Sequence, residues 1–372
     1  MIKLTRLAAA VAFGALILLA VGGAVSAMAL ATIGAPQIVA VTPDDSRDPD
    51  IAYTSGVTHT VWTEVGWIMH SKNTGASWSL PISVTRGDDP SLTAAPNGVL
   101  HLAFTESSSP TINVYTARYT GAAWSAPLQV SSGSNNTSLP DIAAAPNGDL
   151  YVVWSEQTGT PAIQIARSTD GGLAWPSVLP VSSASGNAPK IAIGADGVQH
   201  VVWQDAAAPP FRIKHSERAT TTWTLPALVS DASASSFSPD LAAISGRAHV
   251  VWQQSSSIRY AHGAALLWST PITLSTGSAS EPAIAASSHG ALIAAWDSST
   301  TITARMGGVG GWGSAQTLGS NASGVGHVAL APGRDGVVHA VFTSGASGSR
   351  DIAYNFFKTV GVFLPAVMRN YP

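Results

Sequence analysis

The sequence predicts an all-β chain, a seven-bladed β-propeller of four-stranded antiparallel blades over residues 36–356. Two periodic aromatic residues and a periodic proline carry this prediction, because four short strands in roughly 45 residues, repeated, are typical of propeller blades. The first aromatic is a tryptophan that recurs every 44 to 51 residues, as Trp78, Trp124, Trp175, Trp223, Trp268 and Trp312.

Each repeat presents its strands in the same order. A short apolar run comes first and opens with proline in six copies, at Pro49, Pro90, Pro140, Pro189, Pro239 and Pro282. A turn such as "PNG" leads to a second run that ends in an aromatic residue, at Trp62, Phe104, Trp154, Trp203, Trp252, Trp296 and Phe342. A third run and a tryptophan-led fourth run complete the unit. Short runs bounded by Gly, Pro, Asn and Asp are typical of β-strands.

The two ends of the array predict how the ring closes. The seventh repeat lacks a tryptophan-led fourth strand, whereas residues 36–42, "PQIVAVT", look like a fourth strand without a blade. We therefore expect an N-terminal strand to complete the last blade, with residues 360–365 as the rival strand. Closure leaves the sheets without free edges. The large aromatic rings are expected to pack between neighbouring blades.

The first 31 residues predict export. Lys3 and Arg6 precede an apolar run over residues 7–25, as in a secretory signal peptide, and an uncleaved N-terminal anchor is the alternative. Both interpretations predict a secreted or cell-surface protein, with membrane contact only through an uncleaved leader. The tail, residues 357–372, resembles short C-terminal segments of exported bacterial proteins. It is interpreted as a surface-retention segment or as a final edge strand.

The composition of the chain limits the classes of binding partner that we expect. The chain has no cysteine, so no disulfide supports the fold, and its net charge is −3. No basic run is present, which argues against nucleic acid as a partner. No phosphate-binding loop and no zinc-ligand spacing occur. We expect a monomer whose partner is a glycan or another surface protein.

Two eight-residue stretches carry a family resemblance. "STDGGLAW" and "SKNTGASW" follow the pattern S-x-D-x-G-x-x-W, the second with Asn for Asp, through Ser168, Asp170, Gly172, Trp175, Ser71, Asn73, Gly75 and Trp78. The chain thereby resembles sialidase-like propellers, which carry this Asp-box between the third and fourth strands of a blade. The motif has a structural role, because a short Asp or Asn side chain accepts N–H bonds within its own turn and glycine supplies a positive φ.

The resemblance also implies what a sialidase would need. Three arginines should bind the sugar carboxylate, a Tyr–Glu pair should act as nucleophile and base, and an Asp should act as acid/base. These groups should come from the innermost strands, and we expect no arginine there. The recurring arginines lie on or just after the third strands, towards the outside of the ring: Arg118, Arg167, Arg212, Arg259 and Arg305. We therefore predict a propeller without the sialidase catalytic residues.

Carboxylates recur at one end of the predicted strands. Glu64, Glu106, Glu156 and Asp205 follow the second strands, and Asp50, Asp141 and Asp240 begin the first strands. Antiparallel pairing places both sets on the same face, so they are expected on one rim of the central channel. Three interpretations stay open: a solvated or loop-capping rim, a site for a polar ligand or Ca²⁺, or a carboxylate pair for glycoside hydrolysis.

Histidine opens five of the second strands, at His59, His101, His200, His249 and His339. Equivalent positions in a ring lie far apart, so we expect no metal site and predict instead that each ring bonds to the preceding turn. The sequence thus predicts a non-catalytic glycan- or protein-binding module that binds through the face bearing the carboxylates. The alternatives are a glycoside hydrolase using the acidic rim and a purely structural surface protein.

Overall fold

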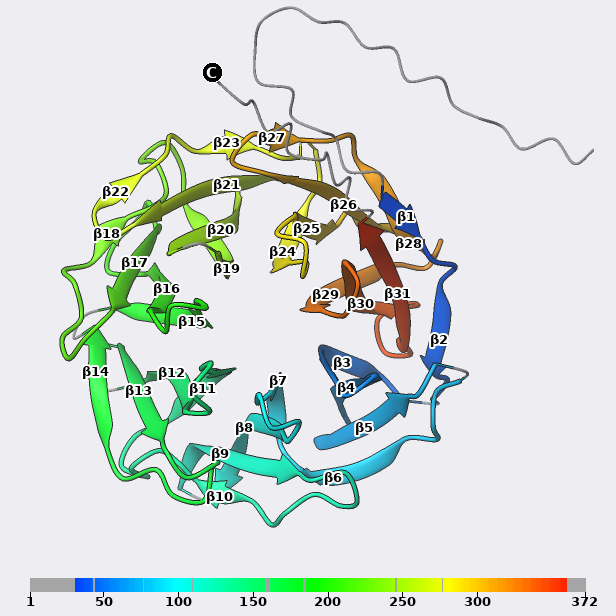
Figure 1. Cartoon of the computed structure of the whole chain (residues 1–372), viewed down its shortest axis with the longest axis horizontal. Coiled ribbons are helices and arrows are strands. Elements are labelled where there is room, and N and C mark those ends of the chain that lie inside the picture. Colours follow the sequence, from blue (N-terminus) through cyan, green and yellow to red (C-terminus); the bar gives the residue numbers. More distant parts are fainter. Residues whose placement is uncertain are drawn as a thin grey trace, which may run out of the picture.

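The computed structural model describes residues 31–359, apart from residues 43, 76, 109, 158, 160, 183, 184, 245 and 276. Its strands form seven antiparallel sheets arranged as blades around a central opening (Figure 1). The predicted seven-bladed propeller is confirmed. No helix in the described part of the chain has the length and apolar character to cross a membrane. The predicted leader, except Ala31, and the tail beyond Thr359 lie outside the described residues.

Each blade runs outward from its innermost strand in chain order. The first four blades consist of β3 (Ser46–Thr54), β4 (Val57–Glu64), β5 (Trp67–Asn73) and β6 (Ile82–Arg86); β7 (Asp88–Ala94), β8 (Leu100–Ser108), β9 (Thr111–Tyr119) and β10 (Leu128–Gln129); β11 (Thr137–Ala144), β12 (Leu150–Glu156), β13 (Ala162–Ser168) and β14 (Val178–Ser182); and β15 (Gly186–Ile193), β16 (Gln199–Asp205), β17 (Arg212–Arg218) and β18 (Ala227–Leu228).

The last three blades have divided outer strands. They consist of β19 (Ser236–Ile244), β20 (Arg247–Gln254), β21 (Ser257–Ala264), β22 (Leu267–Trp268) and β23 (Ile272–Thr273); β24 (Ser280–Ala286), β25 (Leu292–Asp297), β26 (Thr301–Gly308), β27 (Gly311–Trp312) and β28 (Gln316–Ser320); and β29 (Val325–Pro332), β30 (Val337–Ser344) and β31 (Asp351–Thr359), with β1 (Ala31–Ile33) and β2 (Gln37–Ala40) outermost.

The ring closes where the sequence predicts. Strand β2 pairs antiparallel with β31, with Gln37 opposite Tyr354, and β1 pairs with the end of the same strand. The Arg350 guanidinium donates to both carboxylate oxygens of Asp45 at 2.8 and 2.7 Å, which ties the last blade to the chain entering the first. The seventh blade thus joins the two ends of the described chain.

Each innermost strand begins with a β-bulge. The register against the second strand shifts at the same place in all seven blades, for example between Arg47 and Asp50. The bulged residue has a φ near +50° and precedes proline in six blades. Proline fits this position because a bulge interrupts the ladder and leaves an N–H that need not pair. The bulge is therefore the structural reason for the periodic prolines.

The periodic aromatics form the layer between blades. Trp62, Trp154, Trp203 and Trp252 are fully buried. Trp62 of the first blade packs with Val341 and Ile352 of the seventh, as predicted for these rings. The later tryptophans also cross the interfaces, so that Trp78 packs edge-on against Tyr354 with ring centres 5.1 Å apart. Since large rings fill the wedges between the twisted sheets, this layer holds adjacent blades together.

Candidate functional site

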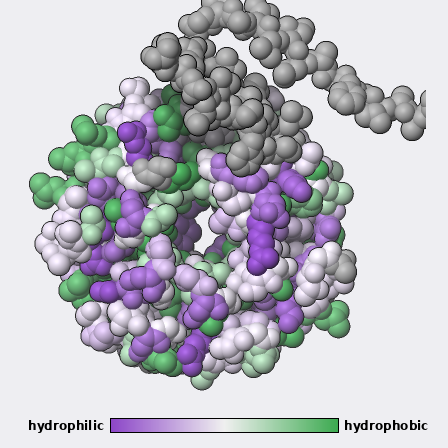
Figure 2. Space-filling view, viewed as in Figure 1, coloured by the Kyte–Doolittle hydropathy of each residue, from purple (hydrophilic) through white to green (hydrophobic). Residues whose placement is uncertain are grey.

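The central channel is a cavity of about 690 Å³ lined by residues of all seven innermost strands. Figure 2 shows the ring open at its centre. Three of the predicted carboxylates, Asp50, Asp141 and Asp240, line it. Lys190 lies among them, and its Nζ is 3.3 Å from Asp141 Oδ1. Asp50, Asp141, Asp240 and Lys190 thus bring three carboxylates and one ammonium group into the channel.

Each of the three aspartates links its blade to the next. The N–H of Leu92 donates to Asp50 at 2.6 Å, that of Ile191 to Asp141 at 2.8 Å, and that of Ile284 to Asp240 at 2.8 Å. Each bond joins the innermost strands of neighbouring blades. Asp50, Asp141 and Asp240 are therefore acceptors that connect neighbouring innermost strands.

The surroundings in the channel shift the pKa of several charged groups that line it. Burial raises the pKa of Asp50 and of Asp240 to about 6, although Lys190 opposes the shift. Asp141 in turn raises the pKa of Lys190. Two carboxyl groups in the channel therefore take up protons close to neutral pH, because desolvation disfavours their charged forms.

One mouth of the channel is charged on one side only. The bulged residues surround this mouth, and four neighbouring blades supply Glu281, His327, Asp48 and Asp89. His327 Nδ1 lies 3.3 Å from Asp48 and 3.4 Å from Glu281. The other three blades supply Leu139, Ala188 and Ser238. These acidic residues were missed because only the bulge turns the residue before each proline towards the mouth.

The four remaining predicted carboxylates do not line the channel. They lie at the ends of the second strands, one strand further out, as Glu64, Glu106, Glu156 and Asp205. Glu64 accepts a bond from Trp62 Nε1 at 3.1 Å, Glu156 from Asn135 Nδ2 at 3.5 Å, and Asp205 pairs with Lys214 at 2.6 Å. Of the seven predicted carboxylates, three therefore line the channel and four lie one strand further out.

One innermost strand carries an arginine, contrary to expectation. Strand β3 begins at Ser46, three residues before the predicted proline-led run, and so includes Arg47. Its side chain is 44% exposed and pairs with Asp88 at 3.2 Å. The error arose because the bulge lengthens the strand towards its N-terminal end. Among the described residues this arginine is alone on the innermost strands.

The two Asp-box stretches form turns of different strength. Asp170 Oδ1 accepts the N–H groups of Leu173 and Ala174 at 3.0 Å and the hydroxyl of Ser168 at 2.7 Å. In the other stretch, Asn73 accepts the single N–H of Gly75 at 2.6 Å. The turn around Asp170 is thus more fully bonded. Both stretches lie at the face opposite the charged mouth, since they connect third and fourth strands.

A second cavity opens at that opposite face, between the third and fourth blades. It measures about 620 Å³, and its polar lining includes Arg167, Arg218, Tyr151, Asp149 and Gln199. The turns that follow β11 and β15 form its rim, and β13 forms one wall. We call it the interblade cavity. It lies between two blades rather than on the propeller axis.

Arg218 is the buried cation of the interblade cavity. The residue is only 9% exposed, and its Nε donates to Gln199 Oε1 at 2.6 Å. The guanidinium carbon lies 5.0 Å from the ring centre of Trp223 and 5.8 Å from that of Tyr151. None of the described carboxylates forms an ion pair with it. Burial lowers the pKa of Arg218, and the nearby Arg167 acts in the same direction.

The other charged groups of the interblade cavity are already bonded. Arg167 donates to Asp149 Oδ2 through Nε and Nη2 at 3.1 and 2.6 Å, and Asp196 Oδ1 accepts the N–H of Val198 at 3.1 Å. Sequence reasoning placed Arg167 towards the outside of the ring and overlooked Arg218. The sequence did contain one indication that this groove differs from the others: Tyr151 stands where five other blades have histidine.

Four of those five histidines, all except His101, bond across strands and not to the preceding turn as predicted. His59 Nδ1 lies 3.0 Å from His70 Nε2, and His249 and His339 bond to Tyr260 and Tyr354 at 2.7 and 2.8 Å. The partners lie on the third strand of the same blade. The prediction failed because the strand twist brings the diagonal neighbour within reach, whereas the turn lies along the strand.

Comparisons with known proteins support the fold. No protein family model matches the chain, and no curated protein matches it by sequence. Among solved structures, an ulvan lyase described as a new polysaccharide lyase family has a TM-score of 0.63 at 10% identity, over 85% of this chain and 94% of that one. A protein of unknown function from Dyadobacter fermentans has a TM-score of 0.57 at 11% identity, over 89% and 99%.

Sialidases share the same architecture. A Trypanosoma rangeli sialidase bound to 2,3-difluorosialic acid has a TM-score of 0.52 at 10% identity, with 84% of this chain covered. The aligned part spans 53% of the sialidase chain. At these identities the likeness establishes a propeller fold shared with sialidases and polysaccharide lyases, and nothing more about chemistry.

Proposed function

We propose that the chain is an exported, non-catalytic glycan-binding propeller whose interblade cavity binds an acidic sugar. One observation carries the proposal: Arg218 is a buried guanidinium that faces a cavity of about 620 Å³ and has no carboxylate partner in the described part of the chain. An unpaired buried charge is costly, and an anionic ligand offsets that cost.

The chemistry of the lining favours a sugar. Arginine recognises carboxylate and sulfate through its planar fork of donors. Asn147, Gln199 and Thr220 add neutral polar groups for hydroxyls, and Tyr151 adds an aromatic surface. The cavity volume also falls within the range of small-ligand sites. These features support a carboxylated or sulfated sugar unit, one or two rings in size.

The names of two similar structures point the same way. One is a sialidase with a sialic acid derivative, a carboxylated sugar, and the other is an ulvan lyase. Their likeness to this chain extends to the fold alone, so it supports a glycan ligand without assigning a reaction. The cavity contains two arginines, of which one is already paired with Asp149. This set supports binding rather than sialidase chemistry.

Glycoside hydrolysis in the central channel is the second candidate. One observation favours it: burial raises the pKa of Asp50 and Asp240 to about 6, the range of a general acid beside ionised carboxylates. Both groups are nevertheless engaged by backbone N–H donors. Hydrolysis of a fluorogenic sialoside or of another fluorogenic glycoside, lost in Asp240→Asn, would establish this candidate instead.

A glycan array tests the proposed function. The full chain is applied to sialylated, uronic-acid, sulfated and neutral glycans, and we expect binding to a subset of the acidic ones. Arg218→Gln should lose at least tenfold in affinity, because it removes the unpaired guanidinium. Arg118→Gln is the charge-matched control, because Arg118 is an arginine of a third strand that does not line the interblade cavity.

A control on the opposite face separates the two candidate sites. Glu156→Gln changes a carboxylate at the end of β12, outside both cavities, and should leave acidic-glycan binding unchanged. Binding confined to neutral glycans, or an Arg218→Gln variant that binds like the parent, would overturn the proposal. Export is tested separately, by cell fractionation and by the N-terminal mass of the extracellular chain.

A further inference from the structure

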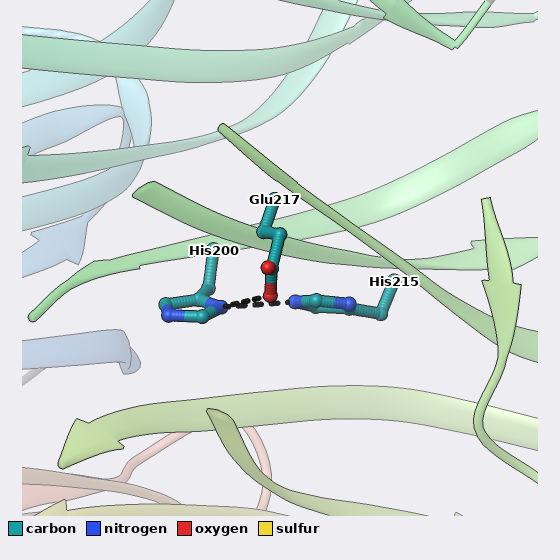
Figure 3. A group of neighbouring side chains, drawn as sticks. All are labelled: His200, His215 and Glu217. Carbon is teal, nitrogen blue, oxygen red and sulfur yellow. Dashed lines mark hydrogen bonds and ion pairs between the residues drawn. The ribbon is translucent and has the colours of Figure 1, made fainter. Parts of the chain in front are cut away.

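A buried trio of side chains lies at the interface of the fourth and fifth blades. His200 comes from β16, and His215 and Glu217 come from β17 (Figure 3). Their potential ligand atoms all lie within 4.8 Å of one another. Figure 3 shows the Glu217 carboxylate between the two imidazole rings. Both rings are fully buried, whereas the Glu217 side chain is 16% exposed.

The spacing matches a metal site. His200 Nδ1 is 3.1 Å from His215 Nε2 and 3.4 Å from Glu217 Oε2. Two ligands held about 2.0 Å from a tetrahedral zinc lie about 3.3 Å from each other. We propose that His200, His215 and Glu217 form a zinc site. This site is separate from the interblade cavity and does not depend on the proposed function.

The charge around the trio suits a cation. The charged groups that act on His200 are Glu217 and Asp196, both carboxylates. His59 and His101 instead face Lys72 and Arg118. A neutral imidazole keeps a lone pair for a metal, and the His215 ring is fully buried with Nε2 facing His200 Nδ1. Two neutral imidazoles and one carboxylate are a common ligand set for zinc.

Proton positions need only a change of tautomer. One ring holds a hydrogen on the nitrogen that faces the other ring, because the two nitrogens share a hydrogen bond. Zinc binding requires that hydrogen on the far nitrogen of the same ring, His200 Nε2 or His215 Nδ1. Neither atom has a partner among the described residues, so no existing bond is lost there. Glu217 binds as the carboxylate, and no proton leaves the site.

The site would join two blades. Glu217 Oε2 also accepts the N–H of Ala265 at 2.8 Å, and Trp268 packs edge-on against His215 with ring centres 4.9 Å apart. Both of these partners belong to the fifth blade. Zinc would therefore fix side chains that already contact the next blade, and it would raise the melting temperature because it binds the folded chain alone.

The first blade provides an internal control. His59 and His70 repeat the histidine pair at 3.0 Å, and Lys72 stands opposite His59 as Glu217 stands opposite His200. An ammonium group at this position repels a cation. The structure therefore predicts one zinc per chain at the fourth blade and none at the first.

Zinc titration of the untagged, chelator-treated full chain tests the site. We expect one Zn²⁺ per chain by calorimetry and by metal analysis, a higher melting temperature with zinc, and the visible absorption of tetrahedral Co²⁺ when cobalt replaces it. Glu217→Gln should weaken zinc binding at least tenfold. His70→Gln should leave it unchanged. Circular dichroism shows whether each variant folds.

A second variant keeps the test decisive if Glu217→Gln fails to fold. His215→Tyr places tyrosine at the position held by Tyr260 in the fifth blade and Tyr354 in the seventh, so the fold accommodates it. It should retain the bond to His200 and lose zinc. The proposal is wrong if the parent chain binds no zinc, if His215→Tyr still binds it, or if His70→Gln abolishes it.

Discussion

The groove between the first and second blades and the groove between the third and fourth are built from the same positions. His59 corresponds to Tyr151 on the second strand, and Lys72 corresponds to Arg167 opposite it. Tyr119 and Arg218 correspond on the following blade, where each is the last residue of the third strand. The chemistry that results is different in the two grooves.

In the first groove, rings contact rings. His70 accepts a bond from Trp124 Nε1 at 3.3 Å, and the ring centres of Tyr119 and Trp124 lie 5.3 Å apart. Lys72 donates to the Tyr119 hydroxyl at 3.3 Å. In the other groove, Arg218 stands in place of Tyr119 and lines a cavity. A propeller can thus change a packed groove into a polar cavity through a few side chains while its strands remain unchanged.

The largest expected effect is on the free energy of unfolding, and it concerns the layer of aromatic rings that both grooves share. Trp203 is fully buried between the third and fourth blades, and Phe104 occupies the corresponding place in the first groove. Trp203→Ala should lower the free energy of unfolding by about 3–5 kcal/mol, the usual cost of deleting a large core ring. Denaturant titration measures it. A loss below about 1 kcal/mol would show that this layer does not hold the blades together.

Lowering the pH should destabilise the folded chain more through the first groove than through the groove between the third and fourth blades. Burial lowers the pKa of His59 to about 4 and of His70 to about 3, both below the unfolded value of 6.5. The unfolded chain therefore binds more protons, and stability that is present above pH 6.5 is lost as pH falls towards 4. Each histidine should cost roughly 1–2 kcal/mol between pH 7 and pH 5.

The double variant His59→Tyr/His70→Ile tests this difference, because it imports Tyr151 and Ile165 from the other groove. Its unfolding free energy should depend less on pH than that of the parent. Asp50 and Asp240 act in the opposite sense, since their raised pKa of about 6 favours the folded chain as pH falls towards 4. Their contribution is the same in both proteins and cancels. Identical pH profiles would contradict the assignment.

A single exchange should convert one groove into the other. Arg218→Tyr places the second-blade residue, Tyr119, into the fourth blade. We expect at least a tenfold loss of acidic-glycan affinity and an unchanged or higher melting temperature, because an unpaired buried charge is removed. Calorimetric titration and thermal unfolding provide the two measurements. Retained affinity would show that Arg218 does not contact the ligand.

The smallest expected effect is a change in melting temperature caused by substitutions in the Asp-box turns. Asp170→Ala removes an acceptor of three bonds, whereas Asn73→Ala removes an acceptor of one. The melting temperature should fall more in the first variant than in the second, and glycan binding should change in neither. The reverse order in a thermal scan would contradict the turn geometry.

Most of the fold follows from the sequence because its causes are local and repeated. A tryptophan every 44 to 51 residues and the proline-led runs mark the blades, and residues 36–42 mark the closing strand. The bulge was not predicted. Its residue before proline looks like an ordinary strand residue in sequence, so the acidic residues at the mouth, such as Asp48 and Glu281, were overlooked.

The candidate sites follow from the sequence only in part, because they combine residues from different blades. Asp50 was placed correctly near the channel, yet its bond to the N–H of Leu92 depends on how neighbouring blades meet. Tyr151, Arg167 and Arg218 are separated by up to 67 residues and meet only when two blades pack side by side. A repeat pattern aligns equivalent positions and does not show which of them face one another.

The most direct measurement is a crystal structure of the full chain with an acidic oligosaccharide selected on the array. The account predicts that the sugar lies between the third and fourth blades, with its carboxylate or sulfate within hydrogen-bonding distance of the Arg218 guanidinium. A sugar bound in the central channel among Asp50, Asp141 and Asp240, with the interblade cavity free of it, would contradict the account.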